Sequence, residues 1–82
     1  MKAPDWKCLN QQAQWQGRDS QGSTLFQDQM WILGGWFTPK EKNPRDAWSS
    51  TDGIEWKCHT EQAPWEFSDL PVTLGFQDRL WI

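Results

Sequence analysis

The chain has 82 residues, a net charge of −3, and eight Trp and four Phe but no Tyr. This length allows one small domain, and an acidic chain without a basic stripe is a poor candidate for binding nucleic acid. No segment is long and apolar enough to span a membrane, and residues 1–6 lack the apolar run of a signal peptide. We therefore expect a cytoplasmic protein that binds neither membranes nor nucleic acids.

Short runs that contain Trp or β-branched residues alternate with Gly, Pro, Asp and Asn, and no window shows helical spacing of apolar residues. This pattern predicts an all-β chain without helices. The expected strands, in chain order, are 5–9, 23–26, 29–33, 47–50, 54–60, 71–76 and 79–82. Tight turns are expected at Gln27-Asp28 and at Thr51-Asp52-Gly53, because these lengths and residue types suit hairpins.

The chain repeats itself at an offset of 50 residues without a gap. Residues 26–32 return as 76–82 with Arg and Leu in place of Gln29 and Met30, and residues 5–8 return as 55–58 with Glu in place of Asp5. Such a period predicts a repeat architecture, in which each unit needs a neighbour to bury its apolar faces. Cys8 and Cys58 are equivalent in this repeat, so we expect two free thiols on separate units, which favours a reducing compartment.

A hairpin that ends in Trp31-Ile32-Leu33-Gly34-Gly35 is followed by a variable loop and the stretch from Asp46 to Trp56. This arrangement resembles the kelch repeat of bacterial kelch-like and galactose-oxidase-like propellers. The second part also resembles a sialidase Asp-box, but it is one residue short between Asp52 and Trp56. The resemblance implies four-stranded antiparallel β-propeller blades with a period of about 50 residues, of which this chain holds about 1.6.

Placed on such blades, residues 5–9 are an outer strand, residues 23–60 a complete blade, and residues 71–82 the inner hairpin of the next blade. Because the inner hairpin at 71–82 has no outer strands of its own in this chain, one sheet edge is open, and open edges recruit partners. We expect head-to-tail homo-oligomerisation into a closed ring, with a trimer favoured over a tetramer. The alternative is that the chain is a fragment of a longer propeller.

The sequence indicates no catalytic residue, no metal site and no cofactor. The copper chemistry of galactose-oxidase-like proteins and the nucleophile of sialidases both require Tyr, which is absent. His59 is expected to be an outer-strand polar residue, and most Asp residues fall at turns or strand ends. We therefore expect a non-enzymatic protein. The alternative is an enzyme subunit with a glycosidase-like carboxylate site formed between subunits.

The long loops at 10–22, 36–45 and 61–70 should lie on one face of the blade, where binding residues usually gather. An aromatic pair with nearby cations can stack on a sugar or hold a peptide. The candidate ligand-binding residues are Trp36, Phe37, Lys40, Lys42, Arg45 and Arg18. The predicted function is a non-catalytic scaffold or binding module for a protein or carbohydrate.

The alternative for Trp36 and Phe37 is packing between blades or subunits. The remaining tryptophans that recur in the repeat are expected to pack within or between blades: Trp6, Trp15, Trp31, Trp56, Trp65 and Trp81.

Overall fold

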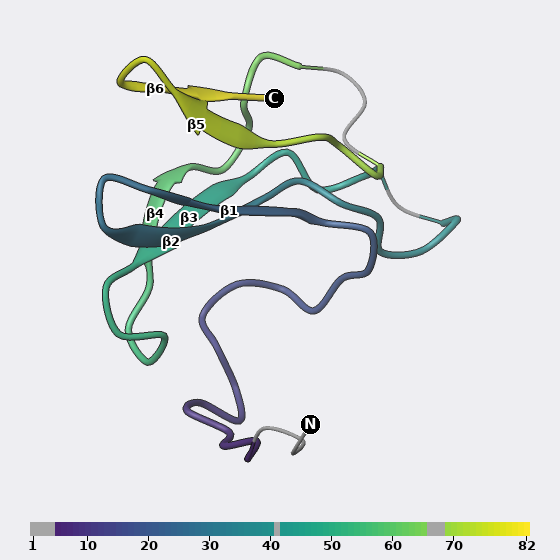
Figure 1. Ribbon diagram of the computed structural model, residues 1–82. Helices are drawn as coiled ribbons and strands as arrows, with labels where there is room; N and C mark the ends of the chain where they lie inside the picture. The colour runs from purple at the N-terminus through teal and green to yellow at the C-terminus, as the bar shows by residue number, and fades with distance from the viewer. Residues whose placement is uncertain (1–4, 41, 66–68) are drawn as a thin grey trace.

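The computed structural model describes residues 5–40, 42–65 and 69–82, and in this part of the chain the fold is all-β with no helix (Figure 1). The strands are β1 (Gly22–Phe26), β2 (Gln29–Leu33), β3 (Ala47–Ser50), β4 (Lys57–Thr60), β5 (Leu74–Phe76) and β6 (Arg79–Trp81). The first four form one antiparallel sheet in the order β1-β2-β3-β4, and the last two form a separate hairpin. The predicted all-β class is confirmed.

Both hairpins close through the same two-residue turn. Gln27 and Asp28 have φ values of 51° and 60°, and Gln77 and Asp78 have 52° and 60°. Two successive residues in the left-handed region define a type I′ turn, whose twist matches that of the flanking strands. The turn predicted at Gln27-Asp28 is therefore confirmed, and the repeat extends to backbone conformation.

The centre of the larger sheet follows the predicted strands closely. β2 and β3 have the expected bounds, and they pair with Trp31 opposite Ser49 and Leu33 opposite Ala47. The strand predicted at 54–60 begins only at Lys57, because residues 51–55 form a turn held by the Asp52 side chain. Asx-type hydrogen bonds of this kind compete with strand pairing.

Two predicted elements need correction. Residues 5–9 form no strand within the single chain, and Trp6 is 91% exposed. A strand persists only when its backbone groups are paired, and among the described residues none pairs with this segment. The strand predicted at 71–76 is limited to Leu74–Phe76, because only these residues face β6.

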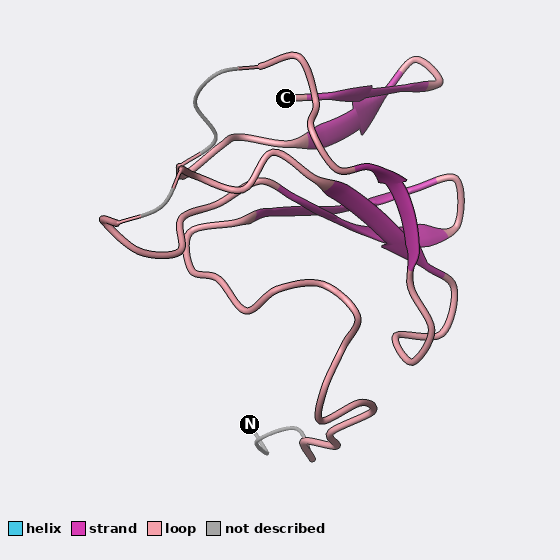
Figure 2. Ribbon diagram, turned by 180° about the vertical axis from the view of Figure 1, so that it is seen from behind, coloured by secondary structure: helices cyan, strands magenta, loops and turns pink. Residues whose placement is uncertain are grey.

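The second hairpin lies against β1 (Figures 1 and 2). Thr73 Oγ1 donates to the carbonyl of Ser23 at 3.1 Å, and a Cβ placed on Gly75 would lie 2.9 Å from Phe26 Cδ1. Thr73 and Ser23 are equivalent in the 50-residue repeat. The two hairpins thus meet through matching strands, and Gly75 permits the close approach.

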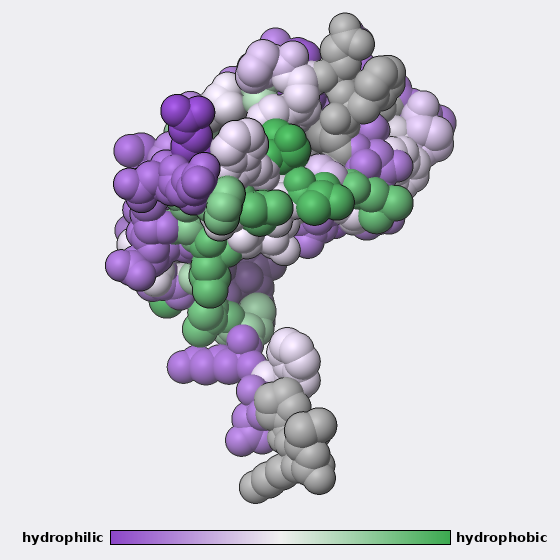
Figure 3. All heavy atoms as spheres, turned by 45° about the horizontal axis from the view of Figure 1, so that its top comes forward, coloured by the Kyte–Doolittle hydropathy of each residue, from purple (hydrophilic) through white to green (hydrophobic). Residues whose placement is uncertain are grey.

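The buried core is small for a chain so rich in aromatic residues. Among the described residues the buried apolar side chains are Leu33, Ala47 and Ala63. The exposed large apolar residues include Leu25, Val72, Leu74, Phe76, Trp81 and Ile82. Figure 3 shows apolar side chains gathered in a band across one face of the molecule. Most aromatic surface is therefore only partly covered within one chain.

Candidate functional site

Described parts of the three long loops meet at one end of the sheet, opposite the turn between β1 and β2 (Figures 1 and 2). Asp19 and Trp36 exchange two backbone hydrogen bonds of 2.9 and 2.8 Å, which join the first loop to the second. The backbone N–H of Ala63 donates to the carbonyl of Arg45 at 2.7 Å and joins the second loop to the third. The predicted arrangement therefore holds only in part, because Asn10 and Gln14 of the first loop are bonded to Ile54 and Trp56, next to the turn at 51–55.

Arg18 is placed inside this loop end and not on its surface. Its side chain is fully buried and forms a salt bridge with Asp46. The Nε atom donates to the carbonyl of Gln16 at 2.9 Å, and Nη1 donates to the carbonyl of Gly34 at 3.0 Å. Because its guanidinium is occupied by these partners, Arg18 supports the loops and is not available as a ligand-binding residue.

Asp46 is the counter-charge that makes this burial tolerable. Its Oδ2 accepts hydrogen bonds of 2.8 Å from Arg18 Nη2 and from Trp48 Nε1. Partial burial raises the pKa of the Asp46 carboxyl, but the hydrogen bonds from Arg18 and Trp48 and the charge of Arg18 outweigh it and lower the pKa overall. The carboxylate therefore stays ionised around neutral pH.

The other predicted residues differ in accessibility. Phe37 is 40% exposed, and Lys40 and Lys42 are exposed. Arg45 is half-buried, and its Nη1 donates to the carbonyl of Trp65 at 3.3 Å. Trp36 is also half-buried. The accessible part of the predicted set is therefore one aromatic ring with two flexible cations.

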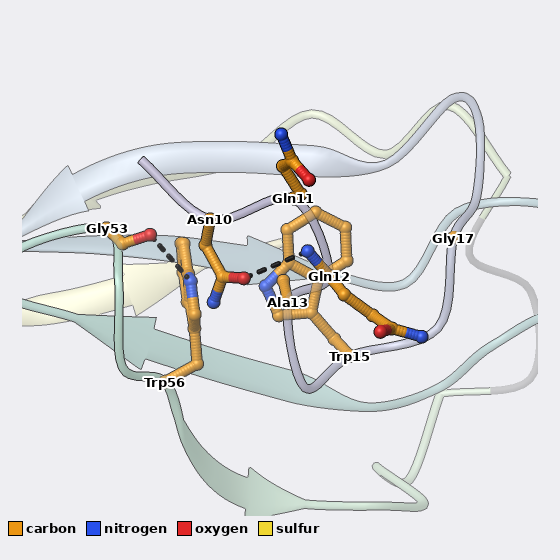
Figure 4. A pocket seen from close by; sticks show the side chains of 8 residues that line it. All are labelled: Asn10, Gln11, Gln12, Ala13, Trp15, Gly17, Gly53 and Trp56. Carbon is orange, nitrogen blue, oxygen red and sulfur yellow. Dashed lines mark hydrogen bonds between the residues drawn. The ribbon is translucent and has the colours of Figure 1, made fainter. Parts of the chain in front are cut away.

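A second candidate site lies away from these residues, between the segment 10–17 and the turn that precedes β4 (Figure 4). It is a hollow of about 360 Å³. Its lining residues are Asn10, Gln11, Gln12, Ala13, Trp15, Gly17, Gly53 and Trp56. We call this feature the tryptophan hollow, because the rings of Trp15 and Trp56 meet edge to face in it, with centroids 5.6 Å apart and planes at 87°.

The turn on one side of the tryptophan hollow is held by short polar side chains. Asp52 Oδ1 accepts from the backbone N–H groups of Ile54 and Glu55 at 2.9 and 3.1 Å. These hydrogen bonds lower the pKa of Asp52. Trp56 Nε1 donates to the carbonyl of Gly53 at 3.2 Å, which fixes the indole against the turn (Figure 4). Asp52 therefore acts as the turn former that the sequence predicts.

Two amide side chains fasten the other side of the tryptophan hollow to this turn. Asn10 Nδ2 donates to the carbonyl of Ile54 at 2.7 Å, while Asn10 Oδ1 accepts from the backbone N–H of Gln12 at 2.9 Å. Gln14 Oε1 accepts from the backbone N–H of Trp56 at 2.8 Å. Contacts between residues more than 40 positions apart thus shape the hollow, and no local sequence pattern reveals them.

A smaller apolar cavity of about 200 Å³ lies between the larger sheet and β6. It is lined by Trp31, Leu33, Ala47, Thr60, Ala63, Pro64, Trp65, Leu80 and Ile82. The indole nitrogens of Trp65 and of its repeat equivalent Trp15 are both buried without a hydrogen-bond partner among the described residues. The packing role predicted for Trp65 agrees with this position, whereas Trp15 also faces the tryptophan hollow.

His59 and Ser49 form a pair that resembles part of a catalytic arrangement. Ser49 Oγ and His59 Nε2 are hydrogen-bonded at 2.7 Å, and the imidazole stacks on Trp31 with centroids 4.4 Å apart. Burial, and then the charge of Lys57, lower the pKa of His59. Ser49 is only 2% exposed, so a substrate cannot reach its hydroxyl. The pair joins β3 to β4.

Among the residues that the structure describes, no cluster of His, Cys, Asp or Glu could hold a metal ion, and no helix is long and apolar enough to cross a membrane. Comparisons with protein-family models, curated proteins and solved structures found no match for this chain.

Proposed function

We propose that the chain is a non-catalytic scaffold module of the β-propeller type, which associates with further copies of itself and presents its loop end to a protein or carbohydrate ligand. The observation that carries this proposal is the second hairpin. It repeats Phe26-Gln27-Asp28 and Trp31-Ile32 in sequence and copies the turn conformation, yet β6 pairs only with β5 among the described residues.

The repeat indicates what the second hairpin lacks. In the first unit, Trp31 Nε1 donates to the carbonyl of Phe26 at 3.2 Å, and Trp81 Nε1 makes the equivalent bond to Phe76 at 2.9 Å. The outer edge of β2 is covered by β3, whereas the corresponding edge of β6 is open and Trp81 is 46% exposed. An open edge with apolar side chains is a site for added strands.

Residues 5–9 of another copy are the proposed occupant of that edge, which gives a blade of three strands in which an outer strand takes the place that β3 has in the first unit. Lys7 and Cys8 are equivalent to Lys57 and Cys58, which lie in the outer strand β4. Residues 5–9 are exposed, and residues 5–8 share their sequence with 55–58 apart from Asp in place of Glu. They therefore suit a strand that forms only when it pairs with another chain. A head-to-tail contact of this kind closes a ring when the rotation allows it, and a trimer remains the favoured size.

The test is the mass in solution by light scattering between 1 and about 100 µM protein, a range that covers standard interface affinities. We expect about three times the 9.7 kDa chain mass. Cys8→Pro removes a backbone donor from the proposed strand and should dissociate the assembly, whereas the matched control Cys8→Ala should not. A monomer over the whole range, or an assembly indifferent to Cys8→Pro, would overturn the proposal.

A further inference from the structure

We propose that the tryptophan hollow is a binding site for a neutral carbohydrate. This site is distinct from the loop end formed by Phe37, Lys40 and Lys42, and it lies within a single chain. The carbohydrate site therefore does not require the oligomer proposed above. The light-scattering experiment tests the oligomer, and the binding experiment below tests the carbohydrate site.

The aromatic part of the hollow provides a surface for a sugar ring. Trp15 and Trp56 are both half-buried, and their near-perpendicular rings form a corner. A pyranose has an apolar face of C–H groups and a rim of hydroxyls. Large, rigid indole rings offer apolar area for the C–H face at a low cost in conformational entropy. A corner of two rings contacts a sugar from two sides.

The polar part of the hollow provides groups that match hydroxyls. Gln11 and Gln12 are exposed, and their side-chain amides make no hydrogen bond within the described chain. Each amide has a carbonyl acceptor beside two N–H donors, which suits a pair of neighbouring hydroxyls. Figure 4 shows the two amide groups extending on different sides of the Trp15 ring. They are available to a ligand that rests on that ring.

The electrostatics favour a neutral ligand. No lining residue of the hollow carries a charge. The nearest cation over Trp15 is Arg18, whose Cζ lies 5.9 Å from the ring centroid, and its charge is balanced by Asp46. An anionic sugar would find no positively charged side chain in the lining of the hollow and would lose part of its hydration, which makes its binding unfavourable.

The hollow is also pre-formed. The hydrogen bonds of Asn10 and Gln14 fix the segment 10–17 against the turn before β4, so little ordering has to accompany binding. Its volume of about 360 Å³ falls at the small end of the range for ligand sites. One or two sugar rings, and not a long chain, are therefore the expected occupants.

The experiment measures binding of the full chain to soluble neutral oligosaccharides derived from glucan, galactan and chitin, with sialylated and sulfated oligosaccharides as the anionic arm. We expect a neutral oligosaccharide to bind and to enhance or quench tryptophan fluorescence. Gln12→Ala should weaken that binding about tenfold through a lost hydrogen bond. Gln16→Ala is the matched control, because Gln16 is exposed in the same segment but does not line the hollow.

Trp56→Phe gives a second readout with an aromatic ring retained. It should reduce affinity for the same oligosaccharide while circular dichroism stays unchanged. Three results would overturn the inference. The first is no binding of any neutral oligosaccharide at millimolar concentration to folded protein, and the second is equal binding by Gln12→Ala and the control. The third is a salt-sensitive preference for anionic sugars that Lys40→Ala and Lys42→Ala abolish, which would assign binding to the loop end.

Discussion

Arg18 Nη2 lies 2.8 Å from Asp46 Oδ2, and this ion pair joins the loop before β1 to the loop before β3. The guanidinium is fully buried and the carboxylate is mostly covered. A buried charge is tolerated only with its partner, so the pair controls how the loop end is assembled. It also holds Trp48, whose Nε1 donates to the same oxygen of Asp46.

Asp46→Asn should therefore destabilise the protein strongly. The amide leaves the buried Arg18 charge without a counter-charge, and removal of one partner of a buried pair costs about 3 kcal/mol or more. The free energy of unfolding from urea denaturation measures the effect. Asp69→Asn, at an exposed position, is the control and should change stability by less than about 0.5 kcal/mol. Equal stabilities of the two variants would contradict a structural role for the pair.

His59 should make stability depend on pH in the weakly acidic range. Its pKa in the fold lies below the ordinary 6.5, first because of burial and then because of Lys57. The unfolded state thus takes up the proton more readily, so the stability contribution is complete above pH 6.5 and is lost as pH falls through the folded pKa. NMR titration of this single histidine measures the shift directly.

Two variants test the cause of this shift. Lys57→Gln should raise the His59 pKa by removing a nearby positive charge, and His59→Gln should flatten the stability profile between pH 7.5 and 5. A folded pKa at or above 6.5 in the unmodified protein would contradict a lowering of the His59 pKa by burial and by the charge of Lys57.

Gly75→Ala should weaken the contact between the two hairpins. The new Cβ would lie 2.9 Å from Phe26 Cδ1 and 3.3 Å from the carbonyl oxygen of Leu25, so β5 has to move away from β1. Overpacking of this kind costs about 1–3 kcal/mol. Gly17→Ala provides the comparison, since nothing lies within 4 Å of its Cβ position. Hydrogen exchange of the β5–β6 amides should accelerate only in the Gly75 variant.

The type I′ turn offers a stabilising change. Gln27 and Asp28 both have positive φ, a conformation that Asn and Gly adopt more easily. Gln27→Asn combined with Asp28→Gly should raise stability by about 1 kcal/mol, which corresponds to a rise in Tm of about 4–8 °C for a small domain. Gln27→Val should lower the Tm instead, because a β-branched residue is strained at positive φ. A lower Tm for the Asn-Gly variant would refute this account of the turn.

The sequence was a good guide to the local elements. The strand run from Gln29 to Leu33 and the two-residue turn before it were predictable, because both depend on neighbouring residues. The 50-residue offset also predicted that a second hairpin copies the first. Asp52 was recognisable as a turn former, and its hydrogen bonds to Ile54 and Glu55 bear this out. These features follow from backbone preferences and short-range hydrogen bonds.

The tertiary contacts around the candidate site were not predictable from the sequence. Arg18 was named as a ligand-binding candidate, but its four hydrogen bonds go to three residues, Gln16, Gly34 and Asp46, and its burial follows from that assembly. Trp15 and Trp56 were expected only to pack, yet they also line the tryptophan hollow. The sequence feature nearest to the hollow was the Asp-box-like stretch that ends at Trp56.

By itself, the sequence determined the central strands β2 and β3, the two-residue hairpin turn and the repeat, because each of these is encoded within a few residues or by direct comparison of two segments. Only the tertiary structure decided which polar groups became buried and which aromatic rings stayed accessible. Asn10 reaches Ile54 and Gln14 reaches Trp56 across more than 40 residues, and these contacts depend on how the loop settles against the sheet. Burial and accessibility are properties of the assembled surface, and a local pattern does not specify them.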